Sequence, residues 1–159
     1  SGLPIFYSQT RLGKNSKVYK IFKFRTMKQD AEKDGKPKMA SENDQRVTRI
    51  GKFLRKTHLD EFPQFINVLK GEMSLVGPRA ERPELVEELE KVVPFYRARL
   101  LIKPGVTGWA QINFGYASNA EETAVKLEYD LYYIQHRNLL LDFSIMLRTF
   151  STMIGFRGQ

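Results

Sequence analysis

The chain has 159 residues, of which 42% are hydrophobic and 28% charged, and this composition is typical of one folded domain rather than of a disordered or repetitive protein. Because it contains no cysteine, structural disulfides and thiolate metal sites are excluded. The excess of 26 Lys and Arg over 18 Asp and Glu gives a net charge of +8, which favours an anionic partner. No apolar run approaches the roughly 18–20 residues that a spanning helix needs, so we expect neither a transmembrane helix nor a secretory leader.

The basic side chains are unevenly distributed. Residues 1–29 carry seven Lys or Arg and no acid, whereas residues 81–91 carry five glutamates. A solvated surface accounts for most of these charges, and a surface that faces phosphates or anionic lipid accounts for the rest.

Two strands are predicted at the start of the chain, over residues 3–8 and 17–27. Aromatic and β-branched residues flank the turn-forming residues 13–16, a pattern typical of a β-hairpin. Side chains alternate between the faces of a strand, so Lys23 and Arg25 should point the same way.

A polar segment separates this hairpin from the first predicted helix. Residues from about 28 to 45 have no apolar periodicity and include Gly35 and Pro37, which predicts a mobile surface loop. Residues 46–56 then show apolar side chains at helical spacing and basic side chains elsewhere. This spacing predicts an amphipathic helix that is apolar on one side and basic on the other.

The next predicted helix begins between Thr57 and Asp60 and ends at Gly71. Thr and Asp are good N-caps, proline is tolerated only in a first turn, and glycine suits a helix end. This assignment places Asp60 and Glu61 at a helix N-terminus, where free N–H groups and the helix dipole stabilise anions. We therefore expect both carboxylates to be ionised at neutral pH.

The rest of the chain is predicted to be mainly helical. A third helix follows Pro83, Ser118-Asn119-Ala120-Glu121 is a capping box that opens a fourth helix to about Gln135, and a fifth helix covers residues 139–154 and is closed by Gly155. A turn at residues 103–105 precedes a short strand over 106–113. Together these elements indicate one compact, helix-rich α/β domain of the α+β type, with a small antiparallel sheet, over residues 1–159.

The segment from Arg55 to Ala80 contains the residue types that phosphate chemistry needs. It holds the pair Asp60 and Glu61 and the turn that ends at Arg79. One carboxylate can attack phosphorus, a second can hold a divalent cation, and an arginine can bind phosphate oxygens. An acidic pair alone is often a helix cap on a surface, but this neighbourhood favours a site for metal and phosphate together. We find no glycine-rich nucleotide motif and no Ser-His-Asp or Cys-His arrangement.

The motifs of this chain, taken in order, resemble those of the bacterial sugar transferases, the monotopic polyprenyl-phosphate phosphoglycosyl transferases. The resemblance covers nearly everything from Pro4 to Ile154. The motifs that carry it are KFRTM at 23–27, RKTHLDEFPQ at 55–64, NVLKGEMSLVGPR at 67–79, KPGVTGW at 103–109 and YDLYY at 129–133.

This resemblance implies a two-step transfer of a sugar-1-phosphate from a nucleotide-sugar donor, usually a UDP-sugar, to a polyprenyl phosphate acceptor, usually with Mg²⁺. It implies that Asp60 is the nucleophile that forms a phosphosugar-aspartyl intermediate. Glu61 matches its catalytic partner and a metal ligand. Arg79 matches the arginine of the family's Pro-Arg-Pro turn, here followed by Ala80, and further phosphate-binding candidates are Arg55, Lys23 and Arg25.

The resemblance also implies a location at the cytoplasmic face of the inner membrane, on an anionic leaflet that the amphipathic helices would face. The hydrophobic N-terminal anchor of the family is absent from these residues, so we expect a piece of a longer protein. No nucleic acid is expected as a partner, and a homo-oligomer is an open alternative. Two other functions stay open: a non-enzymatic basic domain that binds anionic membrane or nucleic acid, and a carboxylate-based phosphohydrolase.

Overall fold

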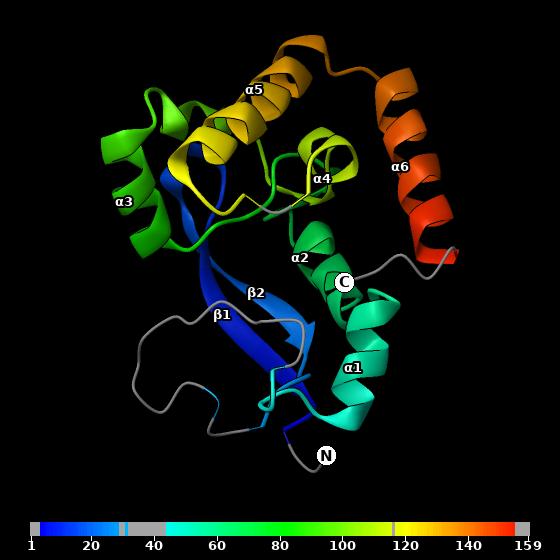
Figure 1. Ribbon diagram of the computed structural model, residues 1–159. Helices are drawn as coiled ribbons and strands as arrows, with labels where there is room; N and C mark the ends of the chain where they lie inside the picture. Colours follow the sequence, from blue (N-terminus) through cyan, green and yellow to red (C-terminus); the bar gives the residue numbers. More distant parts are fainter. Residues whose placement is uncertain (1–3, 29–30, 32–43, 116, 155–159) are drawn as a thin grey trace.

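The computed structural model describes residues 4–28, 31, 44–115 and 117–154, and Figure 1 shows the arrangement of the elements. The strands are β1 (Phe6–Leu12), β2 (Val18–Phe24), β3 (Ser74–Val76) and β4 (Gly105–Thr107). The α-helices are α1 (Arg49–Lys56), α2 (Gln64–Leu69), α3 (Pro83–Val92), α4 (Trp109–Asn113), α5 (Ala120–His136) and α6 (Leu139–Ile154). Three 3₁₀-helices are η1 (Lys14–Ser16), η2 (Leu59–Glu61) and η3 (Tyr96–Leu101). The predicted helix-rich α+β fold is confirmed.

The first sheet is the predicted antiparallel hairpin. β1 pairs with β2 from Phe6 opposite Phe24 to Leu12 opposite Val18, and η1 joins the two strands. The first strand therefore ends at residue 12, not at residue 8. Tyr19 is buried. Side chains alternate between the two faces of a strand, so Lys23 lies on the same face of β2 as Tyr19. This alternation places Lys23 toward the interior.

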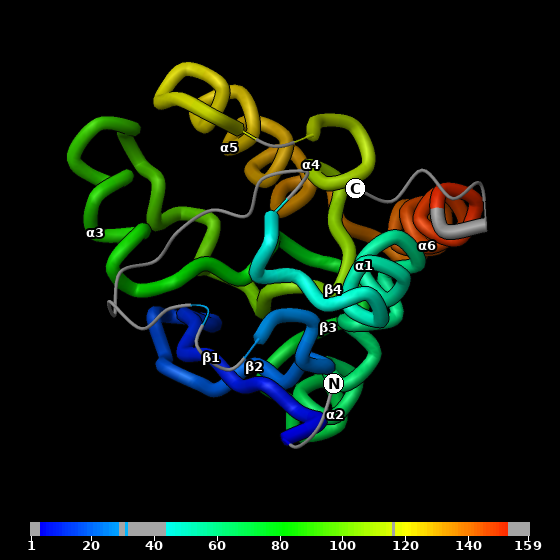
Figure 2. The backbone as a smooth tube through the Cα atoms, turned by 60° about the horizontal axis from the view of Figure 1, so that its bottom comes forward, coloured from blue at the N-terminus to red at the C-terminus, as the bar shows by residue number. Residues whose placement is uncertain are grey.

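The second sheet, a parallel pair of β3 and β4, was not predicted. In Figure 2 it lies in the middle of the molecule, between the hairpin and helices α4 and α5. The predicted strand over 106–113 is wrong beyond Thr107, because α4 begins at Trp109. The two strands approach so closely that a Cβ on Gly105 would lie 2.1 Å from the backbone nitrogen of Gly77. Glycine is therefore required here by contact.

Three apolar clusters form the core. One joins the turn end of the hairpin, at Leu12, to α3, η3 and α5. A second joins β2 to the segment around β3, and a third joins β3 to α5 and α6. Their buried members are Leu12, Val86, Val93, Tyr96, Leu100 and Leu127; Tyr19, Ile21, Met73 and Ala80; and Val76, Ile102, Tyr133 and Ile145.

The predicted helices from Pro83 and from 139 to 154 are confirmed as α3 and α6, and the fourth helix is confirmed with a shifted cap. Asn119, not Ser118, is the N-cap: its Oδ1 accepts from the N–H of Glu122 at 2.8 Å. Glu122 in turn accepts from the N–H of Ser118 at 2.6 Å, so this box closes one residue later than predicted.

The predicted end at Gly155 lies outside the described residues, as does most of the predicted loop over 28–45. Among the helices of the described residues, none has the length and apolar character needed to cross a membrane.

Helix α1 packs tightly against Thr26, just after β2, at the open end of the hairpin. It begins at Arg49, three residues later than predicted, because Thr48 caps it by accepting from the N–H of Gly51 at 2.9 Å. The N–H and Oγ1 of Thr48 both donate to the carbonyl of Thr26, at 2.9 and 3.2 Å. A Cβ on Gly51 would lie 2.0 Å from that carbonyl oxygen. This contact fixes α1, and hence Arg55, relative to the hairpin.

The Gly51→Ala substitution should therefore lower the free energy of unfolding by about 2–3 kcal/mol or more, because α1 or the backbone at Thr26 must move. Urea denaturation would measure the loss. Gly115→Ala is a matched control, since a Cβ there meets nothing within 4 Å. Equal stability of the two variants would contradict the packing described.

Asn67 connects helix α2 to strand β2 and is fully buried. Its Nδ2 donates to the carbonyl of Lys20 at 2.8 Å and to Glu72 at 2.7 Å, and its Oδ1 accepts from the N–H of Phe22 at 3.1 Å. One side chain thus satisfies backbone groups on the edge of β2 that a neighbouring strand would otherwise satisfy. The contact holds Lys23, the next residue, beside the turn that precedes α2.

Candidate functional site

The acidic pair lies in a tight turn between two helices. Asp60 and Glu61 belong to η2, which follows His58 in the left-handed region, with a φ of 55°. The first helical residue of α2 is Gln64, so the prediction of one helix that starts between Thr57 and Asp60 is wrong. The N–H of Glu61 donates to the carbonyl of His58 at 3.2 Å, so it is not one of the free helix-start N–H groups that were predicted here.

Glu61 is the centre of a charged cluster drawn from three distant segments. Its Oε1 accepts from Nζ of Lys23 at 2.6 Å and from NH2 of Arg79 at 3.1 Å. Only 14% of the Glu61 side chain is exposed. Burial alone would raise the pKa of this carboxyl, but Arg79 and Lys23 outweigh it and lower the pKa to about 2. Glu61 is therefore ionised at neutral pH, as predicted.

This lowered pKa makes a prediction for stability. Because the pKa of Glu61 lies below its ordinary value in the folded state, its contribution is present above about pH 4.5 and is lost as the pH falls toward 2. The shift corresponds to roughly 3 kcal/mol. We expect Glu61→Gln to lower stability at pH 7 by up to that amount and to flatten the acid limb between about pH 4.5 and 2. Urea unfolding at several pH values would measure it, with Glu128→Gln, an exposed carboxylate of α5, as the control; an unchanged acid limb in Glu61→Gln would contradict it.

Asp60 has a different environment. Burial raises the pKa of its carboxyl, while Lys23 and Arg55 act in the opposite direction. The helix start that was expected to stabilise both anions is not present at Asp60, which lies in η2 rather than in the first turn of α2, and its burial disfavours the charged form. The two adjacent acids have pKa values displaced in opposite directions, an arrangement typical of paired carboxylates with separate roles.

The two remaining predicted arginines lie near the end of the hairpin. The positive charge of Arg55 favours the ionised form of Asp60 and so acts to lower its pKa. The Nε of Arg55 donates to Oγ1 of Thr26 at 2.9 Å, which orients the side chain. Arg25 follows β2, where its N–H donates to the carbonyl of Ile5 at 2.9 Å. The phosphate-binding role of Arg25 stays a prediction.

Arg79 is held on a rigid base. It forms a β-bridge with Gly105, and the N–H of Gly105 donates to the carbonyl of Pro78 at 2.9 Å. A Cβ on Gly77 would lie 2.6 Å from the carbonyl oxygen of Lys103. The turn that carries Arg79 is thus packed against β4.

Sequence reasoning missed a buried polar network next to Arg79. Arg99 in η3, which is 3% exposed, donates from Nε to Oδ2 of Asp130 at 3.0 Å and contacts the same oxygen through NH2 at 2.7 Å. Its NH1 donates to the hydroxyl of Tyr96 at 2.8 Å. Glu81, two residues after Arg79, lies 3.7 Å from NH1 of Arg99 and 3.8 Å from Nζ of Lys126.

The predicted metal ligand is Glu61. Among the described residues, no group of three or more His, Cys, Asp or Glu side chains could hold a metal ion. Mg²⁺ needs fewer protein ligands, since one or two carboxylates with substrate phosphates and water complete its shell. The adjacent carboxylates of Asp60 and Glu61 fit that requirement, and both cation contacts of Glu61 given above use Oε1.

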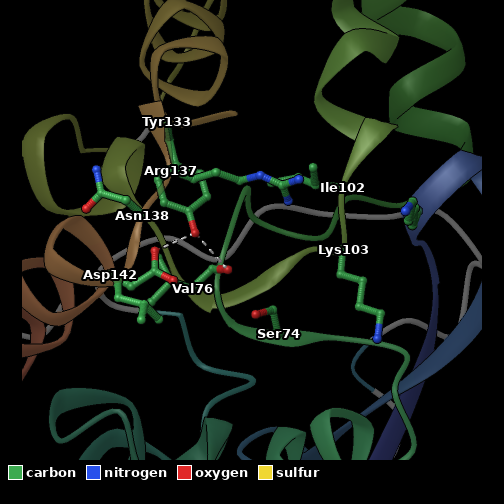
Figure 3. A pocket seen from close by; sticks show the side chains of 10 residues that line it. Ser74, Val76, Ile102, Lys103, Tyr133, Arg137, Asn138 and Asp142 are labelled. Atoms are coloured by element: carbon green, nitrogen blue, oxygen red, sulfur yellow. Dashed lines mark hydrogen bonds between the residues drawn. The ribbon is translucent and has the colours of Figure 1, made fainter. Parts of the chain in front are cut away.

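A surface hollow of about 400 Å³ lies at the start of β3, apart from the acidic pair, and is shown in Figure 3. The hydroxyl of Tyr133 donates there to Asp142 at 2.7 Å and contacts the carbonyl of Val76 at 3.4 Å. Neither Asp60 nor Glu61 lines it. We therefore place the candidate site at the charged cluster of Lys23, Glu61 and Arg79 with Asp60.

Comparisons with known proteins agree with the resemblance. The sequence profile of the family described as "Bacterial sugar transferase" matches residues 1–156. The chain is 45% identical over 157 residues to a UDP-N-acetylgalactosamine-undecaprenyl-phosphate N-acetylgalactosaminephosphotransferase of Aeromonas hydrophila, covering 98% of this chain and 37% of that protein. It is 44% identical over 148 residues to a UDP-glucose:undecaprenyl-phosphate glucose-1-phosphate transferase of Escherichia coli strain K12, covering 92% and 32%. The chain thus spans about a third of the length of these relatives.

Proposed function

We propose that this chain, which belongs to the bacterial sugar transferase family, transfers a sugar-1-phosphate from a UDP-sugar to undecaprenyl phosphate or a similar polyprenyl phosphate. This is the first membrane step of exopolysaccharide or lipid-linked glycan synthesis. The names of the relatives support the donor and acceptor classes. The observation that carries the proposal is the cluster in which Lys23 and Arg79 both bind Glu61, beside the partly buried Asp60.

Asp60 is proposed to act as the nucleophile in two displacements at phosphorus. In the first step, one of its oxygens forms a bond to the sugar-bearing phosphorus, and the bond to the bridging oxygen breaks. The electron pair leaves on that oxygen as the nucleoside monophosphate departs. In the second step an oxygen of the polyprenyl phosphate attacks the same phosphorus, and the bond to Asp60 breaks. Partial burial favours this role because a desolvated carboxylate is the stronger nucleophile.

The basic side chains of the cluster solve the electrostatic problem of this reaction. A carboxylate and a diphosphate repel each other, so attack needs positive charge fixed around the phosphate oxygens. Lys23, Arg55 and Arg79 are positioned by contacts with the protein, and we assign them to phosphate binding with Arg25. Mg²⁺ bound at Glu61 would neutralise further charge on the diphosphate.

Trapping the covalent intermediate tests this proposal. The chain would be incubated with each of a panel of UDP-sugars and Mg²⁺, quenched and analysed by peptide mass spectrometry. A phosphosugar on the peptide that contains Asp60, with release of UMP, is the expected result. The panel also identifies the sugar. Release of free sugar phosphate into water with no adduct would instead favour a phosphohydrolase.

We also propose that the protein associates with the anionic inner leaflet at the cytoplasmic face of the membrane. Helices α1, α2 and α6 lie on one side of the molecule in Figures 1 and 2. Each carries exposed apolar side chains, and α1 also carries exposed Arg49, Lys52 and Lys56. Apolar and basic residues on one surface are typical of interfacial binding. The exposed apolar residues are Ile50, Phe53, Phe65, Ile66, Leu69, Leu139, Leu140, Phe143, Leu147 and Phe150.

Vesicle binding tests this surface. Phe53→Ser and Phe150→Ser should each weaken binding to vesicles that contain anionic phospholipid by about tenfold, because each removes one exposed aromatic ring. Val92→Ser, an exposed position on α3 at the opposite side of the view in Figure 1, should bind as the unchanged chain does. Binding that depends equally on all three positions would contradict the assigned orientation.

A further inference from the structure

A second group of charged side chains lies around Glu81, two residues after Arg79, and Glu81 is its shared acid. Nζ of Lys126, on α5, lies 3.8 Å from Oε1 of Glu81. The N–H of Leu12 donates to the carbonyl of Glu81 at 3.0 Å, which brings the neighbouring Arg11 of β1 beside the same acid. Three separate elements therefore converge here.

This group holds more positive than negative charge. Within the described residues, two carboxylates face the three cations Arg11, Arg99 and Lys126. Asp130 pairs with Arg99 at 2.7 Å, and Glu81 is shared by Arg99 at 3.7 Å and Lys126 at 3.8 Å. The Lys126 side chain is only 16% exposed. Burial lowers the pKa of both Arg11 and Lys126, Glu81 opposes this, and Arg79 lowers each pKa further. Arg79 lies two residues before Glu81 on the same segment and also binds Glu61 at 3.1 Å, so this segment connects the two charged groups.

Partly buried, unbalanced positive charge is costly unless an anion neutralises it. We propose that Arg11 and Lys126, together with Arg79, form a binding position for a phosphate monoester next to the acidic pair. This inference rests on the proposed transfer reaction and adds two residues to its site.

The geometry of the reaction indicates which phosphate occupies this position. In displacement at phosphorus, the attacking and leaving oxygens lie roughly in line. The phosphate that leaves with the nucleoside in the first step and the polyprenyl phosphate that attacks in the second therefore both lie opposite Asp60. Both are phosphate monoesters, and one position serves them in turn. The leaving phosphate gains a negative charge as the bond between its bridging oxygen and the sugar-bearing phosphorus breaks, which is the change that fixed cations stabilise.

Calorimetric titration with UMP tests the position without any turnover. Lys126→Met and Arg11→Gln should each weaken UMP binding by at least about tenfold, as expected for loss of a charge-assisted contact. Lys91→Met, at an exposed lysine of α3, is the matched control and should bind as the unchanged chain does. Thermal melting would establish that each variant is folded, and Arg11→Gln, on a different element, decides the case if Lys126→Met does not fold. UMP affinity that is unchanged in the folded variants would overturn the proposal.

Glu81→Gln separates phosphate binding from a purely structural ion pair. If Lys126 serves only to pair with Glu81, then removing either partner should destabilise the fold and leave UMP affinity alone. If Lys126 binds phosphate, Glu81→Gln releases it from its competitor and should strengthen UMP binding, the opposite of Lys126→Met. Lys126→Arg should keep UMP affinity within about threefold, because the charge is preserved. Equal UMP affinity in Glu81→Gln and Lys126→Met would overturn the assignment.

A short-chain prenyl phosphate distinguishes the two phosphates. We expect it to displace UMP from the unchanged chain, and to bind Lys126→Met at least about tenfold more weakly, as UMP does. Prenyl phosphate binding that is insensitive to Lys126 would overturn the shared position. The two proposals can also fail separately. If UMP binding depends on Lys126 but the chain forms no adduct with any UDP-sugar, the phosphate position is supported and the transferase proposal is contradicted.

Discussion

Replacement of Asp60 by asparagine should abolish exchange of labelled UMP into the UDP-sugar, with a loss of at least about a thousandfold. Asparagine keeps the size of the side chain but lacks the anionic oxygen that would form the bond to phosphorus. Exchange requires only the first displacement and its reversal, so it needs no lipid acceptor. Incorporation of label, measured at a fixed UDP-sugar concentration, gives the rate.

Glu88→Gln, an exposed position of α3, controls for the loss of a carboxylate as such and should exchange at the unchanged rate. The pH profile gives a second readout. Because burial raises the pKa of Asp60 and only the ionised carboxylate attacks, the exchange rate should fall as the pH drops through a pKa above that of an ordinary aspartate. Exchange by Asp60→Asn at the unchanged rate would exclude the covalent mechanism.

The elements that the sequence predicts correctly are those set by local patterns. The hairpin follows from two strands around a turn, and α3, α5 and α6 follow from apolar spacing and caps. The helix predicted to begin between Thr57 and Asp60 fails because the left-handed turn at His58 leads into the separate 3₁₀-helix η2, and α2 begins only at Gln64. The strand predicted over 106–113 fails because only residues 105–107 find a partner, and β3 lies about thirty residues away in sequence. Long-range pairing decides strand length, and periodicity alone does not contain it.

The acidic pair and Arg79 are recognisable from the residues and the resemblance, but their electrostatics are not. Lys23 and Glu61 are far apart in sequence and meet because Asn67 joins α2 to β2. One signal for the missed network was present in the sequence. Asp130 follows the buried Leu127 by three residues on α5, and an acid on the apolar side of a helix requires a buried cationic partner.

The Arg99 and Asp130 pair should show the largest effect on stability. Asp130→Asn removes the charge that balances Arg99, which is 3% exposed. Burial alone would lower the pKa of Arg99, but Asp130 outweighs it and raises the pKa, so the guanidinium stays charged in its buried place. Removing the hydrogen-bonded partner of a buried charge typically costs about 3–5 kcal/mol, and Glu81, 3.7 Å from NH1 of Arg99, makes no such hydrogen bond to it. Urea denaturation of Asp130→Asn should show a loss in that range.

Two further variants establish the cause of that loss. The double substitution Arg99→Met with Asp130→Leu removes both charges and should be more stable than Asp130→Asn, because apolar side chains can replace a buried ion pair with little loss. Glu90→Gln disrupts the exposed pair of Glu90 with Arg97 and should barely change the midpoint, since solvent screens surface pairs. A double variant that is less stable than Asp130→Asn would mean that the packing of these side chains, and not the uncompensated charge, sets the cost. The fold would then hold Glu81 and Lys126 in place beside Arg79 through shape rather than through charge balance.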